Sequence, residues 1–424
     1  MAGKAAAVLP LSRREKKFRH SWPLTTALAG GGILVGLLLV EAGLRLIDVP
    51  LAASFYAPDP EIGWALRPGA SGWSLGESRT HVTINSRGLR DREHTLQKPA
   101  GSYRIAVLGD SYTEALNVEV DQAWWAVLER ELADCRALNG LIPEVINFGV
   151  SGYGTAQELL MLRHRVRDYH PDLVILGFYP GNDLYDNHPL LNFNPSRQQA
   201  PFFRLEGEDV VLDDSFRRAP KLRGWAIRLA NVRGNLANRS RVLQLVFKVV
   251  NDLRTSAARP SREKQTATAG VELREEQLFT PPTDQRIEEA WGLTEALIAA
   301  TDREAVRWGA RFLLIVIPAR PQVHPDPAWK AELAARLGAA DLSYPDQRLR
   351  ALADRKHLRI LPLTEPLAAY AEANNAFLHG GTPFIAAGEG HWNATAHRLA
   401  ARTIAVAMCA DLAAESSQIP SDSK

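Results

Sequence analysis

Short apolar segments alternate with longer helical patterns from residue 104 to residue 413. We expect strands at residues 104–108, 144–148, 172–178, 311–317 and 358–361, and helices at residues 121–134, 156–169, 285–308, 343–356 and 394–413. Strands that are separated by helices run parallel in one sheet, and the helices then cover both faces of that sheet. The sequence therefore predicts an α/β fold with a five-stranded parallel sheet.

A serine stands directly after the first of these strands. Gly109 ends the apolar run of residues 104–108 and permits a sharp turn, and Ser111 follows it at the start of the next helical pattern. The carboxyl edge of an open parallel sheet is where ligands bind, and the positive end of a helix dipole points there. This position makes Ser111 a candidate nucleophile.

Three later segments bring further polar groups to the same edge of the sheet. Gly152 follows the second strand in the segment INFGVSGYG, Asn182 follows the third strand, and His391 lies on a loop before the last helix. Acyl transfer by a serine needs a base that takes the hydroxyl proton and donors that stabilise the oxyanion. We expect His391 to be the base, and the Gly152 N–H and the Asn182 amide to be donors.

These four blocks, in this order, resemble those of the SGNH, or GDSL, hydrolase superfamily, and the resemblance covers residues 55 to 410. It implies a flavodoxin-like three-layer fold and a serine esterase or acyltransferase. In such a site Ser111 is the nucleophile, its own N–H joins Gly152 and Asn182 in the oxyanion hole, and His391 is the general base. Relatives with one N-terminal anchor include proteins of polysaccharide O-acetylation.

The acid of the triad departs from the family pattern. Many relatives carry an aspartate three or two positions before the histidine, and here those positions hold Gly388 and Glu389. Residues i and i+2 of an extended loop point to the same side, so we expect Glu389 to orient the His391 ring. The alternative is that Glu389 is a solvated loop charge and that a backbone carbonyl orients His391. For the protein as a whole, the alternative to an enzyme is a non-catalytic glycan-binding or scaffold protein that retains the fold.

The N-terminus predicts a membrane anchor. Residues 1–20 are basic and residues 21–40 carry no charge, and twenty such residues in a helix span about 30 Å. Because basic flanks stay in the cytoplasm, we expect a cytoplasmic tail at 1–20 and an anchor at 21–47 in a bacterial inner membrane, with the remainder periplasmic or otherwise extracytoplasmic. A cleaved signal peptide is the alternative, although its apolar region is normally shorter.

The remainder divides by composition. We expect a juxtamembrane extended or hairpin region at 48–100, a hydrolase domain at 101–414 with an insertion at 187–284, and a disordered tail at 415–424. Residues 216–254 of the insertion hold ten Lys or Arg residues against one acid, which favours an anionic partner, either a charged glycan or phospholipid headgroups. The net charge of +2 for the whole chain argues against a nucleic-acid binder.

The remaining expectations concern cysteines, cofactors and substrate. Cys135 and Cys409 are the two cysteines, and either a disulfide or two buried free thiols fit the sequence. No Cys/His spacing for zinc and no phosphate-binding loop is present, so we expect no metal and no cofactor. The expected substrate is an acylated glycan or lipid of the cell envelope.

Overall fold

The computed structural model describes residues 22–47, 49–192, 199–250, 252–253 and 277–418. The chain forms two units, Met1–Val49 and Pro50–Lys424. The expected cytoplasmic tail, residues 254–276 of the basic and polar insertion, and the last six residues lie outside the described residues.

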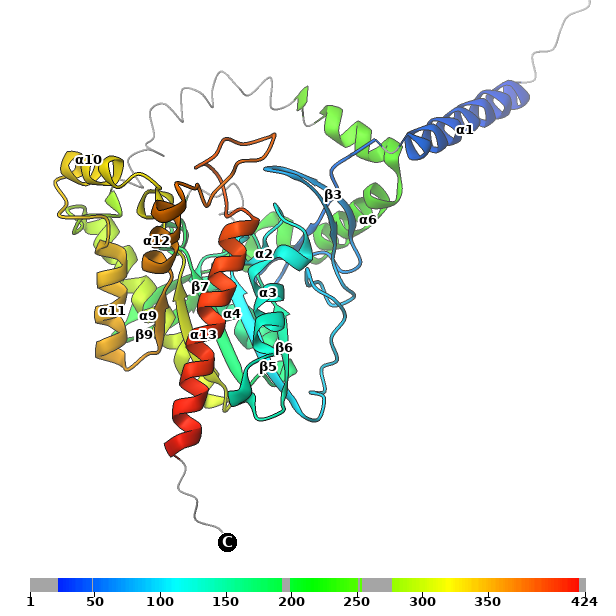
Figure 1. Cartoon of the computed structure of the whole chain (residues 1–424). Coiled ribbons are helices and arrows are strands. Elements are labelled where there is room, and N and C mark those ends of the chain that lie inside the picture. Colours follow the sequence, from blue (N-terminus) through cyan, green and yellow to red (C-terminus); the bar gives the residue numbers. More distant parts are fainter. Residues whose placement is uncertain (1–21, 48, 193–198, 251, 254–276, 419–424) are drawn as a thin grey trace, which may run out of the picture. The chain divides into compact units, whose positions relative to one another are not determined.

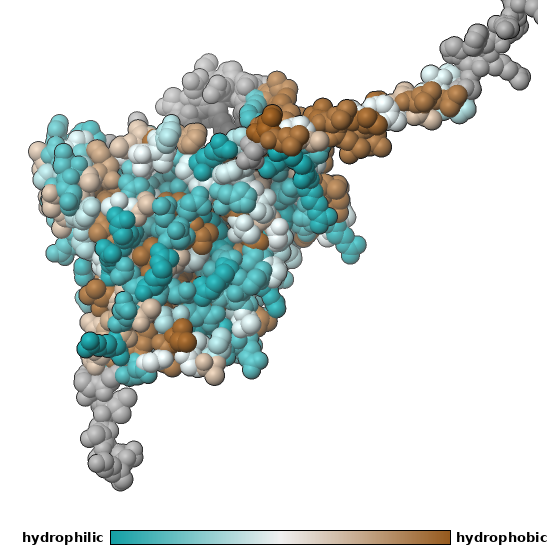
Figure 2. Space-filling model, turned by 45° about the vertical axis from the view of Figure 1, so that its right-hand side comes forward, coloured by the Kyte–Doolittle hydropathy of each residue, from teal (hydrophilic) through white to brown (hydrophobic). Residues whose placement is uncertain are grey.

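The first unit contains helix α1, Trp22–Leu46, whose side chains are almost all exposed. Figure 2 shows this helix brown along most of its length. Glu41 and Arg45 form an ion pair near its end, at 2.7 Å. Among the described residues it is the one helix long and apolar enough to cross a membrane, a property that an anchor and a signal sequence share.

The second unit is built on a five-stranded parallel sheet (Figure 1). Its strands are β5 (Ser102–Gly109), β6 (Ile142–Asn147), β7 (Leu173–Phe178), β10 (Arg311–Val316) and β11 (Ile360–Pro362). They lie in the order β11-β10-β7-β5-β6, with every neighbouring pair parallel. The expected five-stranded sheet and its flavodoxin-like order are confirmed.

Helices cover both faces of this sheet (Figure 1). α3 (Trp124–Leu132) and α13 (Ala394–Gln418) pack together on one face, and α4 (Thr155–His164) and α9 (Gln285–Arg307) pack together on the other. α11 (Tyr344–Lys356) packs beside α9. Two helices were not expected, α10 (Pro327–Leu337) and α12 (Thr364–Asn374). α13 also continues to Gln418. Residues 415–418, which we expected to belong to a disordered tail, are therefore the last turn of this helix.

Two antiparallel hairpins precede the sheet. They are β1 (Tyr56–Asp59) with β2 (Gly63–Leu66), and β3 (Ser71–Leu75) with β4 (Arg79–Thr83). Apolar side chains of this region, including Ile62, Trp64 and Val82, belong to the same hydrophobic core as the sheet. Side chains of the region at 48–100, which we expected as a separate juxtamembrane segment, are therefore part of the core of the domain. Burial of these apolar side chains stabilises the two hairpins and the sheet together.

The short helix α5 (Asp183–Asp186) follows β7, and the insertion after it contains a third hairpin, β8 (Phe202–Glu206) with β9 (Asp209–Asp213). It continues with α6 (Gly224–Arg239), and residues 241–250 are also helical. β9 and β8 lie against α9. α6 lies against β1, and so the insertion covers the first hairpin.

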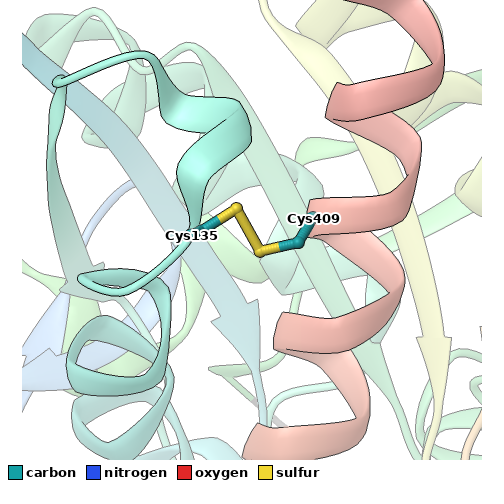
Figure 3. The surroundings of a disulfide bond; sticks show 2 residues. All are labelled: Cys135 and Cys409. Atoms are coloured by element: carbon teal, nitrogen blue, oxygen red, sulfur yellow. A yellow bond between two sulfur atoms is a disulfide. The ribbon is translucent and has the colours of Figure 1, made fainter.

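A disulfide joins the two cysteines across the sheet face that α3 and α13 cover (Figure 3). Cys135 lies just after α3 and Cys409 lies on α13, and their Cα atoms are 5.9 Å apart. Of the two alternatives that the sequence left open, the bridge is the one that the structure contains. It closes a loop of 274 residues.

Removing this bridge should destabilise the domain. The double variant Cys135→Ser/Cys409→Ser loses a link that restricts the unfolded chain, and we expect its free energy of unfolding to fall by about 2–4 kcal/mol. Urea denaturation of the full chain in detergent measures the difference. Reductant should lower the stability of the wild type to that of the variant, and equal stability of variant and oxidised wild type would contradict the prediction.

Candidate active site

Ser111 begins the short helix α2 (Ser111–Glu114) directly after β5. Asp110 caps this helix, because its Oδ1 accepts a hydrogen bond from the Tyr112 N–H at 2.9 Å. Gly109 has φ = +156°, and a Cβ there would lie 2.2 Å from Thr113 Oγ1. Only glycine therefore permits the turn that leaves the serine at the edge of the sheet.

A continuous chain of hydrogen bonds runs from this serine to a carboxylate. His391 Nε2 lies 2.7 Å from Ser111 Oγ, and His391 Nδ1 lies 2.6 Å from Glu77 Oε1. The backbone N–H of His391 also donates to Glu77 Oε2 at 2.7 Å. An ionised Glu77 accepts a hydrogen bond from the Nδ1–H group, which leaves Nε2 unprotonated and able to accept a hydrogen bond from the serine hydroxyl. The arrangement is that of a serine–histidine–carboxylate triad.

The carboxylate comes from Glu77 and not from Glu389. Glu77 lies at the tip of the β3–β4 hairpin, 314 residues before the histidine that it contacts. Glu389 is exposed, and no hydrogen bond joins its carboxylate to His391. The expected extended loop is instead turned by Gly388 and Gly390, at φ = +88° and +67°. The i, i+2 argument for Glu389 therefore fails, because its premise was an extended backbone.

Gly390 explains how Glu77 reaches the histidine. A Cβ at residue 390 would lie 2.5 Å from Glu77 Oε2, so a side chain there would displace the carboxylate. The sequence signal for Glu77 is weak: an acidic residue within a Gly-Glu-Ser turn between two short alternating strands. Such a turn is common in hairpins, and nothing in it indicates a distant histidine.

The charges of the pair reinforce each other. Burial lowers the pKa of His391, but the hydrogen bond and the charge of Glu77 outweigh burial, so that the pKa of the imidazole is raised. Burial alone would raise the pKa of the Glu77 carboxyl. The hydrogen bonds from His391 and the attraction to its charge outweigh burial, so the pKa of Glu77 is lowered. Glu77 is therefore a carboxylate that stabilises a protonated His391.

The three expected oxyanion donors lie on loops at the same edge of the sheet. Asn182 Nδ2 donates to Asp110 Oδ2 at 2.8 Å, which holds the amide beside the nucleophile, and its second N–H is not used in that bond. Gly152 has φ = +78° on the loop after β6. The neighbouring Ser151 N–H donates to Glu114 Oε2 at 2.5 Å, so the loop is tied to α2.

The first hairpin fixes the Gly152 loop from the other side. Tyr56 OH donates to the fully buried Glu114, at 3.0 Å from Oε2, and Trp64 Nε1 donates to the Ser151 carbonyl at 3.2 Å. Burial, as the largest effect, raises the pKa of Glu114, although its hydrogen bonds lower it. Arg90, also fully buried, donates to the carbonyls of Glu114 and Ala115. Residues before the sheet thus supply the carboxylate beside His391 and position the Gly152 loop.

Two hollows meet at Ser151. A cleft of about 160 Å³ lies at the triad, and a groove of about 480 Å³ lies on the other side of the Gly152 loop. The cleft is lined by Ser74, Gly76, Glu77, Ser111, Leu116, Asn117, Ser151 and His391. Tyr56, Trp64, Gly152, Gln199 and Lys221 are among the residues that line the groove. Among the described residues, no group of three or more His, Cys, Asp or Glu is arranged to hold a metal ion.

Comparison with known proteins agrees with the motifs. No protein-family model matches the chain. The esterase TesA of Pseudomonas aeruginosa is 30% identical over 117 residues, which are 28% of this chain and 56% of TesA. The chain thus spans about half the length of this relative.

Among solved structures that align with this chain is a crystal structure of TesA. The alignment has 15% sequence identity and a TM-score of 0.34, and it covers 71% of this chain and 95% of the TesA chain. An acetyl xylan esterase follows at 14% identity and a TM-score of 0.36, over 72% and 98%. The fold is defined here by the strand order of this chain itself, with a serine and a histidine at the carboxyl edge of a flavodoxin-like sheet. The partial match to the esterase TesA agrees with the resemblance to the SGNH, or GDSL, hydrolase superfamily that the four sequence blocks indicate.

Proposed function

We propose that this protein is a serine ester hydrolase with Ser111 as nucleophile, His391 as general base and Glu77 as the acid of the triad. The observation that carries the proposal is the unbroken hydrogen-bond chain from Ser111 Oγ through both ring nitrogens of His391 to Glu77. A non-catalytic protein that merely retains the fold would have no need to keep this alignment. The similarity to an esterase over part of its length also supports the proposal.

The geometry supports a two-step acyl transfer. His391 Nε2 takes the proton of Ser111 as Oγ attacks the ester carbonyl, and the imidazolium then passes that proton to the departing alcohol. The N–H groups of Ser111 and Gly152 and the amide of Asn182 stabilise the oxyanion. Water, or a sugar hydroxyl in a transferase, then attacks the acyl-enzyme; His391 removes the proton of the attacking group and gives it to Ser111 Oγ as the bond between Oγ and the acyl carbon breaks. The acceptor alone separates esterase from O-acetyltransferase.

The substrate we propose is a short acyl ester on a glycan or lipid of the bacterial cell envelope. The cleft at the triad, at about 160 Å³, has room for an acetyl or another short acyl group. The larger groove beside it, lined by Trp64, Gln199 and Lys221, suits the polar remainder of such a substrate. An envelope location rests on α1 as an anchor.

A fluorophosphonate probe tests the function, because it reacts only with an activated serine. The full chain in detergent should be labelled, and peptide mapping should place the label on Ser111. Ser151→Ala is a matched control, since Ser151 lines the same cleft and its loss should leave labelling intact. A folded protein that is not labelled, or a label on Ser151, would refute the assignment.

We further propose that α1 is an uncleaved anchor with the domain outside the cytoplasm. Alkaline phosphatase fused after Lys424 should then be active, because that enzyme folds only in an oxidising compartment. A blot should show the full length, without the loss of about 4 to 5 kDa that removal of a signal peptide would cause. An inactive fusion would overturn the topology, and a shortened band would identify α1 as a signal peptide.

A further inference from the structure

Helix α6 carries an apolar stripe that faces away from the domain. Trp225, Leu229, Val232 and Leu236 are 66%, 60%, 57% and 53% exposed. Their spacing of four, three and four residues places them on one side of the helix. Four large apolar side chains in one exposed row are unusual for a surface helix, whose outer face is normally polar.

The opposite side of α6 is fixed to the domain, so the stripe cannot turn inward. A Cβ on the buried Gly234 would lie 2.2 Å from Arg67 Nη2, and Arg67 Nη1 donates to Asn231 Oδ1 at 2.9 Å. Ala237 on the same side is also buried. The small residues of this side permit the helix to lie close to β1, and the large ones remain outside.

The helical segment that follows α6 continues the pattern. Val246 and Val249 are each 48% exposed, and Leu253 is 66% exposed. We call the seven exposed apolar residues, Trp225, Leu229, Val232, Leu236, Val246, Val249 and Leu253, the apolar surface of the insertion. Two consecutive helical segments therefore expose apolar side chains at helical spacing.

Basic residues surround this surface. Arg228, Arg233, Arg239 and Lys248 are exposed on the same two segments, and Arg223 is exposed directly before α6. The acid among the described residues of these segments is Asp252, and Lys248 pairs with it at 2.6 Å. An apolar stripe bordered by arginines is the composition of a helix that lies in the interface of an anionic membrane.

The place of α6 in the domain fits such a partner. Asn238 binds the backbone of Ser54 twice, accepting from its N–H at 2.8 Å and donating to its carbonyl at 3.0 Å. Ser54 is only eight residues beyond Leu46, the end of α1. By covalent geometry alone, eight residues reach no more than about 28 Å, so a spanning α1 would keep this end of the domain near the bilayer.

We propose that the apolar surface of the insertion docks on the anionic phospholipid bilayer in which the protein is anchored. The apolar side chains enter the boundary between headgroups and acyl chains, and the arginines bind lipid phosphates. A charged glycan would bind the arginines but leave the apolar row in water. A second copy would bring two basic surfaces together, which disfavours self-association. Docking is independent of the ester chemistry and would orient the active site relative to the membrane.

Site-specific labelling of the full chain in lipid nanodiscs tests docking. Leu229→Cys carries an environment-sensitive fluorophore, and Val306→Cys on α9 is the matched control, with an exposure of 58% against 60%. The native cysteines are bridged and do not compete for the label. In nanodiscs of phosphatidylcholine with phosphatidylglycerol, the fluorophore at 229 should shift to the blue and be shielded from iodide, while that at 306 stays accessible. Equal accessibility at the two positions would overturn the proposal.

Two further arms separate the possible partners. In the labelled protein, Arg223→Gln and Arg228→Gln should each lower the ratio of docked to free domain by about fivefold, and nanodiscs of phosphatidylcholine alone should weaken docking similarly. Shielding at 229 by a soluble polyuronate in neutral nanodiscs would identify a glycan surface instead. Shielding in detergent that grows with protein concentration would identify a dimer. Either result would overturn docking on lipid, and fluorophosphonate labelling of Ser111 should be unchanged in all these variants.

Discussion

Replacing Glu77 by glutamine should lower turnover roughly 10,000-fold, the size of effect that loss of the triad carboxylate has in serine hydrolases. Glutamine is nearly isosteric, so the geometry of the hairpin tip is kept. Its uncharged amide cannot stabilise the imidazolium of His391, and it does not select the tautomer that accepts the Ser111 proton at Nε2. Steady-state kinetics on a short-chain acyl ester measures the effect, which should fall on kcat with little change in KM.

The matched control is Glu389→Gln. Glu389 is exposed and lies two residues from His391, so it tests whether any carboxylate near the loop suffices. We expect its turnover to remain near the wild-type value. The reverse outcome, an active Glu77→Gln and a severely impaired Glu389→Gln, would restore the glutamate that the sequence alone suggested.

The pH profile gives an independent reading of the same pair. His391 must be neutral to act as a base, and Glu77 raises the pKa of its imidazole above the ordinary histidine value. In the wild type kcat/KM should therefore fall on the acid side below a pKa that is higher than about 6.5. Glu77→Gln removes the negative charge that raises the pKa of His391, so the residual activity of this variant should persist to lower pH. An unchanged acid limb in the variant would mean that another group sets it.

Replacing Ser111 by alanine should lower turnover roughly a millionfold, because the variant lacks the hydroxyl that forms the acyl-enzyme. Among the described residues, the hydroxyl lies 2.7 Å from His391 Nε2 and 3.5 Å from Asp110 Oδ2, and it fills little space, so we expect the fold to be retained. Circular dichroism and the denaturation midpoint check that retention. Wild-type hydrolysis by a folded Ser111→Ala variant would show that the activity belongs to another serine or to a contaminant.

The sequence predicted those parts of the site that have local signals. Ser111, Gly152 and Asn182 each follow an apolar strand, and parallel strands bring their carboxyl ends to one edge. His391 precedes a long helical pattern, so its loop is also confined to that edge. The resemblance to a family added their roles, which remain proposals.

Glu77 has no such signal. Its position depends on how a hairpin of the first core-forming residues packs against a loop near the C-terminus, and side-chain periodicity contains no information on contacts of that range. Glu389 is the better candidate by its proximity to His391 in the sequence. The positive φ angles of Gly388 and Gly390 turn the loop, so Glu389 does not face the histidine as it would on an extended backbone. Helix α10 was missed although Asp326 caps it and Pro327 begins it, two signals that the sequence does display.

The separation of Glu77 from His391 also sets the order in which the enzyme can become active during synthesis. The hairpin, Ser111 and Asn182 all leave the ribosome long before the histidine, which emerges 314 residues after its carboxylate. Cys409, which closes the disulfide, is made later still. By the proposed mechanism, a nascent or truncated chain that stops before His391 holds an inert serine, because the base that activates Ser111 has not yet been made.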